Sequence, residues 1–461
     1  MKDFGIKWKG CKFLAVAICI FAAVFLLTAC GDSNGYGYDE YEYVYMYNEY
    51  GELVLMAVPP TTPPPPPPTT PTPTPAPPTI ITFSGFERHN AVNLALVRAF
   101  NESQNSVYVQ YIEFSPFEQA HLRLEAVIAS GDRIFDVIDI NALWAREMVR
   151  NNALMPLTSH LLHNPIELAN LHPALLAAGE HNDAFWAIPR GFTVGVLAMR
   201  DDYVALAPSS LAALNNHAYA FRNEGWDFGY ASSLGNFEET FRIMLEFIYG
   251  HGGRITDEYG NFNITNSGAV AGLEAMREAA QIGGIPENTA FFAGADAHEA
   301  FFAGNTPFLR SDSDIWAAGN FIGRVGDVRF AIAPMPHPTE APIMDGYLLG
   351  ISAASANPAQ AWEFIQFVAS EQGQIINARY GSQIPANTEL MQNRLVRQNN
   401  PHFGLAQFQR LAENAQIGFQ SPQFREILQI IQIEFAQFIQ GEITAQQMTR
   451  EIQRAVNIIT P

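Results

Sequence analysis

The sequence predicts an α/β fold built on a parallel sheet, and the arrangement of residues 79–140 supports this prediction. Three runs rich in β-branched and aromatic residues, at 80–83, 107–114 and 135–140, have the composition of buried strands. Segments with helical spacing of apolar residues separate them, at 91–104 and 116–131. Strand–helix–strand units of this length place their strands parallel, with right-handed crossovers, as in a doubly wound sheet.

Each of these two helices carries a signal of its own. Leu94, Val97 and Phe100 are expected on one buried face of the first helix. The second opens with residues 115–118 (SPFE), which have the pattern of a capping box with proline in the first turn. Gly131 is expected to end it.

The rest of the chain predicts further strands and helices. The expected elements are a strand pair over 184–203, a hairpin over 252–265 turning at Gly260, and strands at 328–338 and 344–352. Helices are expected after Asn357-Pro358, with Trp362, Ile365 and Val368 buried, and at 421–440 and 444–458.

The first thirty residues have the layout of a lipoprotein signal peptide. Four lysines precede an apolar run at 13–27, which is short for a membrane span and suitable for a signal sequence. Residues 27–30 (LTAC) resemble the lipobox of bacterial lipoproteins, which implies that residues 1–29 are removed and that Cys30 is acylated. An uncleaved N-terminal membrane anchor is the alternative. Either reading places the rest of the chain on the extracytoplasmic face of the cell membrane.

Two biased segments separate this signal from the globular part. Residues 30–58 are acidic and rich in tyrosine, and their uncompensated charge predicts disorder, with a single strand or adhesion to a wall polymer as alternatives. Residues 59–78 are almost all proline and threonine, which favours a polyproline II spacer about 60 Å long. The globular part is therefore expected at 79–461.

Composition excludes several kinds of chemistry. Every lysine lies within residues 1–12, so the rest of the chain has no Walker-type lysine, Schiff-base lysine or kinase-type lysine. Cysteine occurs only at Cys11, Cys19 and Cys30, which leaves a chain acylated at Cys30 without a free thiolate or a disulfide. The net charge of −20 becomes about −23 without residues 1–29, which disfavours nucleic acid as a partner. No enzymatic activity, cofactor or metal is expected.

Five segments, in order, resemble the solute-binding proteins of ABC importers, in the carbohydrate-binding group typified by maltose-binding protein. They are NALMPLTSHL (152–161), NDAFWAIPRGFTVGVLAMRDDY (182–203), GHGGRITDEYGNF (250–262), AFFAGNTPFLRSDSDIW (300–316) and MDGYLLGISAASANPAQAWEFIQFVAS (344–370). The chain departs from the family pattern at 197–200 (LAMR) and 305–307 (NTP), where the family shows Tyr-Tyr-Asn-Lys and Lys-Ala-Ala.

This resemblance implies two α/β lobes joined by hinge strands. The first lobe is expected to comprise about 79–190 with part of 330–375, and the second about 200–330 with the C-terminal helices. A monomer of this kind encloses a sugar or oligosaccharide between its lobes by hinge closure and presents it to the permease subunits of an ABC transporter.

Candidate ligand contacts follow from what sugars require, namely flat apolar faces and paired hydrogen bonds. The aromatic candidates are Trp144, Trp186, Trp316 and Tyr347, for which packing is the alternative role. Trp362 is expected on the buried face of a helix. The polar candidates are Glu87, Arg88, Asp139, Arg190 and Asp345, with Asp312 a weaker choice and a helix-entry salt bridge as the alternative for Glu87 and Arg88.

The sequence is also compatible with other ligands and other functions. The same fold would suit a peptide, a polyamine or an organic anion. A glycosidase that used Glu87 and Asp139 as its carboxylate pair is much less favoured. The histidines at 160, 163, 172 and 181 match no metal-ligand spacing. A lipoprotein with only an adhesive or sensory role is the last alternative.

Overall fold

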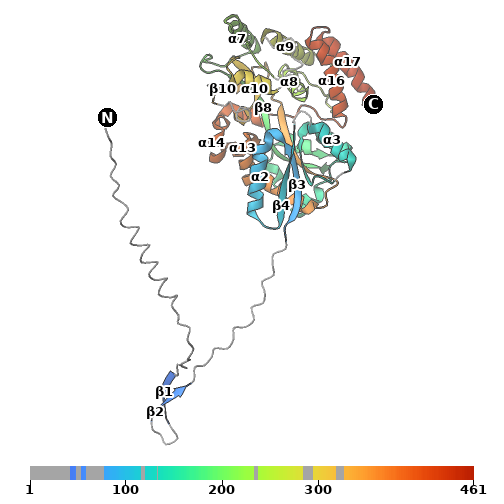
Figure 1. Cartoon of the computed structure of the whole chain (residues 1–461). Helices are drawn as coiled ribbons and strands as arrows, with labels where there is room; N and C mark the ends of the chain where they lie inside the picture. The colour runs from blue at the N-terminus through green and yellow to red at the C-terminus, as the bar shows by residue number, and fades with distance from the viewer. Residues whose placement is uncertain are drawn as a thin grey trace, which may run out of the picture. The chain divides into compact units, whose positions relative to one another are not determined.

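The computed structural model describes residues 42–47, 53–58, 77–115, 120–131, 133–232, 237–283, 294–317 and 326–460 (Figure 1). The chain divides into two compact units, Met1–Pro75 and Ala76–Pro461. The signal peptide with its lipobox and residues 59–76 of the spacer lie outside the described residues, so those expectations stay predictions.

The first unit contains a β-hairpin where disorder was expected for residues 30–58. Strand β1 (Glu42–Tyr47) pairs antiparallel with β2 (Leu53–Val58), in a register that joins Glu42 to Val58 and Tyr47 to Leu53. The prediction was wrong for these strands because it weighed the charge of the whole segment. Only one acidic residue, Glu42, lies within them, and the others are mostly aromatic or aliphatic residues that favour strands.

The second unit opens with the predicted parallel strands. Strands β3 (Thr79–Phe86), β4 (Val107–Phe114) and β5 (Val137–Asn141) lie in the order β4-β3-β5, with β3 parallel to both neighbours. Strand β11 (Met344–Ile351) continues the sheet antiparallel to β5 and to β8. These strands and the helices on their two faces form the first lobe (Figure 1).

Side chains that alternate along β5 separate the two faces of this sheet. Val137 packs with residues of α2 (Asn90–Ser103) and α12 (Pro358–Ala369), whereas Ile138 and Ile140 pack with those of α3 (Ala120–Ser130) and α4 (Ala145–Arg150). As predicted, Trp362, Ile365 and Val368 are buried on α12.

The expected face of α2 was partly wrong. Leu94 is 47% exposed, while Leu96, Val97 and Phe100 are buried. Residues spaced by three, such as 94, 97 and 100, are offset from one another by about 60° around an α-helix. The first and last residues of such a set therefore lie on different faces. The expected capping box at 115–118 stays a prediction, because residues 116–119 lie outside the described residues. The Ser115 hydroxyl donates a hydrogen bond to Glu87 Oε2 at 2.7 Å.

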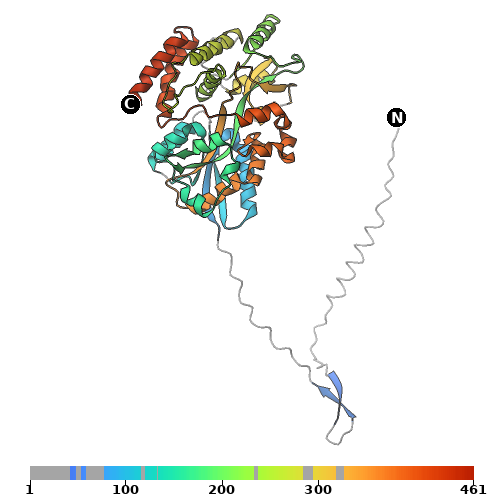
Figure 2. The same cartoon turned by 180° about the vertical axis from the view of Figure 1, so that it is seen from behind.

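One long strand passes from the first lobe into the second. Residues 184–203 were expected to form a strand pair, but residues Ala187–Met199 form a single strand, β8, in which every residue is buried. Its first half pairs with β11 and β12 (Ile384–Pro385), and its second half with β9 (Phe308–Asp312) and β10 (Ala331–Pro334). Strand β8 therefore takes part in the strand pairing of both lobes and links them (Figure 2).

The second lobe consists of β9, β10 and the second half of β8 with surrounding helices. Residues 252–265 make the predicted turn, with Gly260 at φ +85° and a single bridge between Thr256 and Phe262. The helices of this lobe are α7 (Leu211–Asn223), α8 (Phe237–Gly250), α9 (Ser267–Gly283), α10 (Gly294–Phe302), α16 (Phe424–Ile439) and α17 (Ala445–Ile459).

Shorter elements complete the second unit. They are α5 (Thr158–His163), α6 (Pro173–Gly179), β6 (Glu180–His181), β7 (Ala184–Phe185), α13 (Glu371–Gly381), α14 (Arg394–Asn399) and α15 (Ala406–Glu413), with 3₁₀ turns η1 (Glu87–His89), η3 (Ala142–Trp144), η4 (Leu168–Asn170), η6 (Thr388–Gln392) and η7 (Pro401–Gly404). Within the described part of the chain, no helix has the length and apolar character that a membrane crossing requires.

Candidate functional site

The candidate site lies where the strands of the first lobe end and the hinge strands continue. Tyr347 of β11 pairs with Asn141, the last residue of β5, and with Gly191 of β8. The carboxyl end of β3 leads directly into η1, which carries Glu87 and Arg88. Ligands of such sheets bind beyond the carboxyl ends of the strands, so this level of the molecule is where a solute site is expected.

Three of the sequence-predicted residues come together at this level. Arg88 donates a hydrogen bond to Asp345 Oδ2 at 2.7 Å and another to the Tyr347 hydroxyl. The Tyr347 hydroxyl donates to the same oxygen of Asp345 at 2.5 Å. The other oxygen, Oδ1, accepts a bond from the Asn141 amide at 2.6 Å.

Asp345 also faces cations from both lobes. Arg242 NH2 of α8 lies 3.8 Å from Asp345 Oδ2. Burial opposes ionisation of this carboxyl group, but the positive charges of Arg242 and Arg88 outweigh burial and lower the pKa of Asp345 below its ordinary value. Asp345 is therefore a carboxylate that links a cation of the first lobe to one of the second.

A series of ion pairs continues from Asp345 into the second lobe. Arg242 binds Asp312 with two hydrogen bonds of 2.7 and 2.8 Å, and Arg310 NH1 approaches Asp312 at 3.1 Å. Arg310 in turn binds Glu246 at 2.7 and 3.0 Å. Paired geometry of this kind fixes the orientation of each guanidinium group.

The sequence prediction missed Arg242, although a signal was present. Arg242 and Glu246 are both about 3% exposed and stand one turn apart on α8, in a segment that is otherwise largely apolar. Charged residues inside an apolar helical run are rarely buried unless they are paired. That pattern marks a polar network, but it does not reveal which residues of β9 complete it.

Asp314 lies two residues beyond β9 and close to the same charges. Burial, followed by the negative charge of Asp312, raises the pKa of Asp314 to about 7, against the opposing effect of Arg88. At neutral pH this carboxyl group is therefore partly protonated, and it can donate a hydrogen bond as well as accept one.

Asp314→Asn is expected to remove a pH dependence of stability. A carboxyl group with a folded pKa of about 7 and an ordinary pKa of 3.8 when unfolded binds more protons in the folded state, so its contribution is greatest at low pH and is lost as the pH rises through 7. The variant should match the wild type at pH 5 and exceed its free energy of unfolding at pH 8 by about 2.5 kcal/mol, since stabilisation changes by about 1.36 kcal/mol per pH unit between pH 5 and the folded pKa of about 7. Thermal unfolding from pH 5 to 8.5 measures this difference.

The matched control for this experiment is Asp183→Asn. Asp183 is exposed and already has a positive φ of 56°, a conformation that asparagine also tolerates. An Asp314→Asn protein with the same pH dependence as the wild type and the control would contradict the assignment.

The two tryptophans nearest this level have partners within the protein. Trp144 is 1% exposed, stacks on His121 with ring centroids 4.3 Å apart and donates from Nε1 to Glu238 Oε2 at 3.1 Å. Trp316 is half-buried and stacks on His402 at 4.5 Å. Glu238 belongs to α8, so Trp144 reaches across from the first lobe to the second.

Trp186 lies elsewhere. It precedes Ala187, which pairs with Gly350, and Gly350 pairs with Ile138 near the start of β5. The register therefore places Trp186 toward the amino end of β5, away from the ends of the strands where Asn141 and Tyr347 meet. Its Nε1 donates to the carbonyl of His181 at 3.0 Å, which is a local packing role.

Asp139 and Arg190 form a buried pair of their own. Both side chains have no exposed surface, and Arg190 NH1 donates to Asp139 Oδ2 at 2.5 Å. Arg190 Nε donates to Asn377 at 3.1 Å, and His89 Nδ1 lies 3.8 Å from Asp139. The two charges pair with each other, although Asp139 Oδ1 and Arg190 NH2 have no hydrogen-bond partner among the described residues. The ion pair gives both residues a role in the fold that needs no ligand.

Comparison with known proteins agrees with this architecture. Residues 95–404 match the family described as bacterial extracellular solute-binding protein. A probable ABC transporter-binding protein of Deinococcus radiodurans is 28% identical over 183 residues, which cover 38% of this chain and 43% of that protein. The match thus spans less than half of that relative's length.

Solved structures with the same fold are similar over most of the second unit. Maltose-bound MalE3 of Thermotoga maritima has a TM-score of 0.72 at 21% identity, covering 83% of this chain and all of that one. The GacH receptor of Streptomyces glaucescens has a TM-score of 0.68 at 17% identity, covering 82% and 98%. A ribitol-bound solute-binding protein of Agrobacterium radiobacter has a TM-score of 0.69 at 16%, covering 84% and 100%.

These likenesses confirm the two-lobed α/β fold that the sequence predicts. The family match extends over more than half of the chain, from α2 through the hinge strands to η7. The chain therefore belongs to the bacterial extracellular solute-binding proteins.

Proposed function

We propose that this protein captures a sugar or oligosaccharide between its two lobes and delivers it to the permease of an ABC importer. The observation that carries the proposal is the position of Asp345 on hinge strand β11. It binds Arg88 of the first lobe and faces Arg242 of the second, so polar groups of both lobes converge on one point.

The chemistry of these groups suits carbohydrate. Guanidinium and carboxylate groups are planar and make paired hydrogen bonds, which match neighbouring hydroxyl groups on a sugar ring. Their charges are already balanced by one another, so the site does not call for a charged ligand. The proteins of similar fold were solved with maltose, acarbose and ribitol.

The proposed contacts combine sequence-predicted residues with residues found in the structure. Arg88, Asp345 and Tyr347 would bind hydroxyl groups, and Arg242, Asp312 and Asp314 would complete the set from the second lobe. Glu87, beside Arg88 on η1, and Trp316, beyond β9, are proposed at its rim. Trp144 is left out because it is 1% exposed and stacks on His121. Trp186, Asp139 and Arg190 are left out of the proposed set because of the positions and internal partners described above.

Hinge motion would couple this site to transport. Strands β8 and β11 join the lobes, while direct contacts between them, such as Trp144 with Glu238, hold them together in the present arrangement. A ligand that contacts both lobes stabilises the closed state by its higher affinity for that state. The permease would then recognise the closed protein.

An organic anion is the second candidate ligand. Arg88 and Arg242 both reach Asp345, and a carboxylate ligand placed among them would meet two guanidinium groups. Thermal-shift measurements on the purified protein separate the candidates. Stabilisation by mono- or oligosaccharides at millimolar concentration supports the sugar proposal, whereas stabilisation only by organic acids, amines or peptides would overturn it in favour of another solute.

We further propose that the mature chain is held at the membrane by a lipid on Cys30. Support comes from the sequence alone, namely the charged start, the apolar run and the small residues before Cys30. In cells that express the full chain, Cys30→Ala should abolish lipid labelling and shift most of the protein out of the detergent-extracted membrane fraction. Cys19→Ala, within the apolar run, is the matched control, and retained lipid labelling of Cys30→Ala would contradict the proposal.

A further inference from the structure

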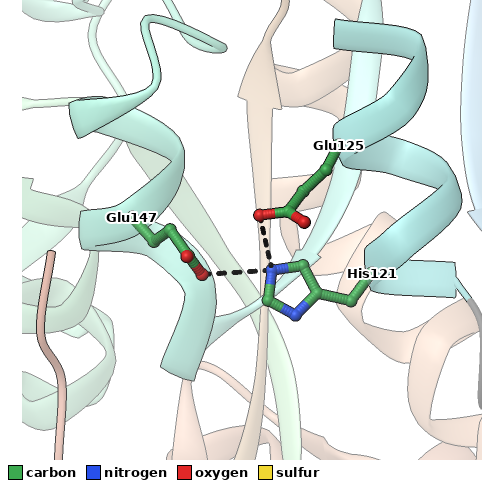
Figure 3. Close-up of side chains that lie close together, drawn as sticks. All are labelled: His121, Glu125 and Glu147. Carbon is green, nitrogen blue, oxygen red and sulfur yellow. Dashed lines mark ion pairs between the residues drawn. The ribbon is translucent and has the colours of Figure 1, made fainter. Parts of the chain in front are cut away.

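A second group of ligand-type side chains lies at the edge of the first lobe, apart from the proposed sugar contacts. His121 and Glu125 stand one turn apart on α3, and Glu147 faces them from α4 (Figure 3). One ligand atom from each of the three residues lies within 4.8 Å of the others. The sequence does not reveal this arrangement, because strand β5 separates α3 from α4 along the chain and only the packing of the lobe brings the two helices together.

The distances within this group approach those of a metal site. His121 Nε2 is 3.2 Å from Glu147 Oε2 and 3.8 Å from Glu125 Oε1. Ligand atoms of tetrahedral Zn²⁺, with bonds of about 2.0 Å, stand about 3.3 Å apart. The distance from His121 to Glu147 already fits this spacing, whereas Glu125 would have to approach His121 by about 0.5 Å. The ligand atoms of Glu125 and Glu147 lie within 4.8 Å of each other, so the two carboxylates would also have to move closer together.

Two of these atoms are buried and have partners only within this group. His121 is 6% exposed and Glu147 is 2% exposed, and His121 Nε2 forms an ion pair with Glu147 Oε2 at 3.2 Å. A cation that replaced the proton of this pair would bind both atoms and leave neither one unpaired. The dashed lines in Figure 3 mark the ion pairs that join His121 to Glu147 and to Glu125.

The groups behind His121 match the surroundings of a metal-bound imidazole. His121 Nδ1 lies 3.1 Å from Glu238 Oε1, and the other oxygen of Glu238 accepts a bond from Trp144 at 3.1 Å. A histidine that binds a metal through one nitrogen commonly donates from the other to a carboxylate, which fixes its orientation. Stacking of the imidazole on Trp144 at 13° restrains the ring further.

We propose that His121, Glu125 and Glu147 bind a divalent transition-metal ion, with Zn²⁺ bound more tightly than Mn²⁺. A divalent cation would displace the proton of the ion pair between His121 and Glu147, and it would neutralise the charge of about −2 that the imidazole and two carboxylates then carry. Three protein ligands leave a position open for water. Arg425 pairs with the second oxygen of Glu125, which leaves Oε1 facing His121. Because Glu238 belongs to the second lobe, the ion would also strengthen a contact between the lobes.

The test uses the purified full chain, freed of metal with a chelator and titrated with Zn²⁺ by calorimetry, with the bound metal counted by mass spectrometry. One equivalent should bind with a dissociation constant in the micromolar range or below. His121→Gln and Glu147→Gln should each weaken binding at least about 100-fold. His163→Gln, an exposed residue of α5 bonded only to its own helix, is the matched control and should bind like the wild type.

Two controls keep the outcome clear. Glu125→Gln, at a partly exposed position, tests the site if a variant of a buried ligand fails to fold. Sugar-induced thermal shifts of each variant report on the solute site independently, so failure of the metal proposal leaves the function proposal standing. A wild-type protein that binds no Zn²⁺, or a folded His121→Gln protein that binds it as tightly as the wild type, would overturn the proposal in favour of a protonated His121 held between carboxylates.

Discussion

Arg88→Ala is expected to abolish measurable solute binding without unfolding the protein. The guanidinium group of Arg88 is 29% exposed and binds Asp345 and Tyr347, so it presents the polar face of the first lobe to the site. Its loss removes charge-assisted hydrogen bonds to the ligand and to Asp345, which should reduce affinity at least about 100-fold, or about 3 kcal/mol. Calorimetric titration with the best solute from the thermal-shift screen measures the change.

The fold should tolerate this substitution because Asp345 keeps Asn141 and Arg242 as partners. Arg98→Ala is the matched control, since Arg98 is an exposed residue in the middle of α2. It removes the same side chain and charge from the same lobe and should leave affinity unchanged. Equal affinities for wild type and Arg88→Ala would remove Arg88 from the site and with it the main support for the proposed contacts.

Asp139→Ala is expected to cause a large loss of stability. Arg190 would remain buried with no carboxylate within reach, and uncompensated charges of this kind cost about 3–5 kcal/mol. The free energy of unfolding, measured with denaturant on the soluble part of the chain, should fall by that amount. Replacing both residues together, as in Asp139→Leu with Arg190→Met, should restore much of the stability because no unpaired charge remains.

The outcome also separates the two roles proposed for Asp139. Asp227→Ala, at an exposed position, controls for the loss of a carboxylate and should change stability by less than about 0.5 kcal/mol. If Asp139→Ala kept nearly full stability and lost ligand affinity instead, the residue would be a ligand contact, as the sequence first predicted.

The fold was largely predictable from the sequence because its strands and helices carry strong local signals. The runs at 80–83, 107–114 and 135–140 became β3, β4 and β5, and the two C-terminal helices formed close to their expected positions. The hairpin at 42–58 was not predicted, since the expectation rested on average charge rather than on the alternation within each strand. Strand β8 was expected as two strands because its length exceeds that of most strands.

The sequence predicted only those site residues that follow directly from the order of the strands along the chain. Arg88 follows a strand of the parallel sheet and Tyr347 lies on a hinge strand, so position in the sequence implies position near the site. Arg242 and His121 project from helices, and their partners depend on how the lobes pack, which no local pattern encodes. Conversely, Asp139 and Arg190 lie on strands at positions where ligand contacts are expected, but they form an ion pair with each other.

A crystal structure of the protein with its most stabilising solute would show whether a sugar binds between the lobes at Asp345. We expect a sugar in contact with Arg88 or Asp345 from the first lobe and hinge, and with Arg242 or Asp314 from the second. We also expect the interlobe angle to differ between the free and bound forms. A solute bound to one lobe only, or away from Asp345 with unchanged lobes, would contradict binding between the lobes.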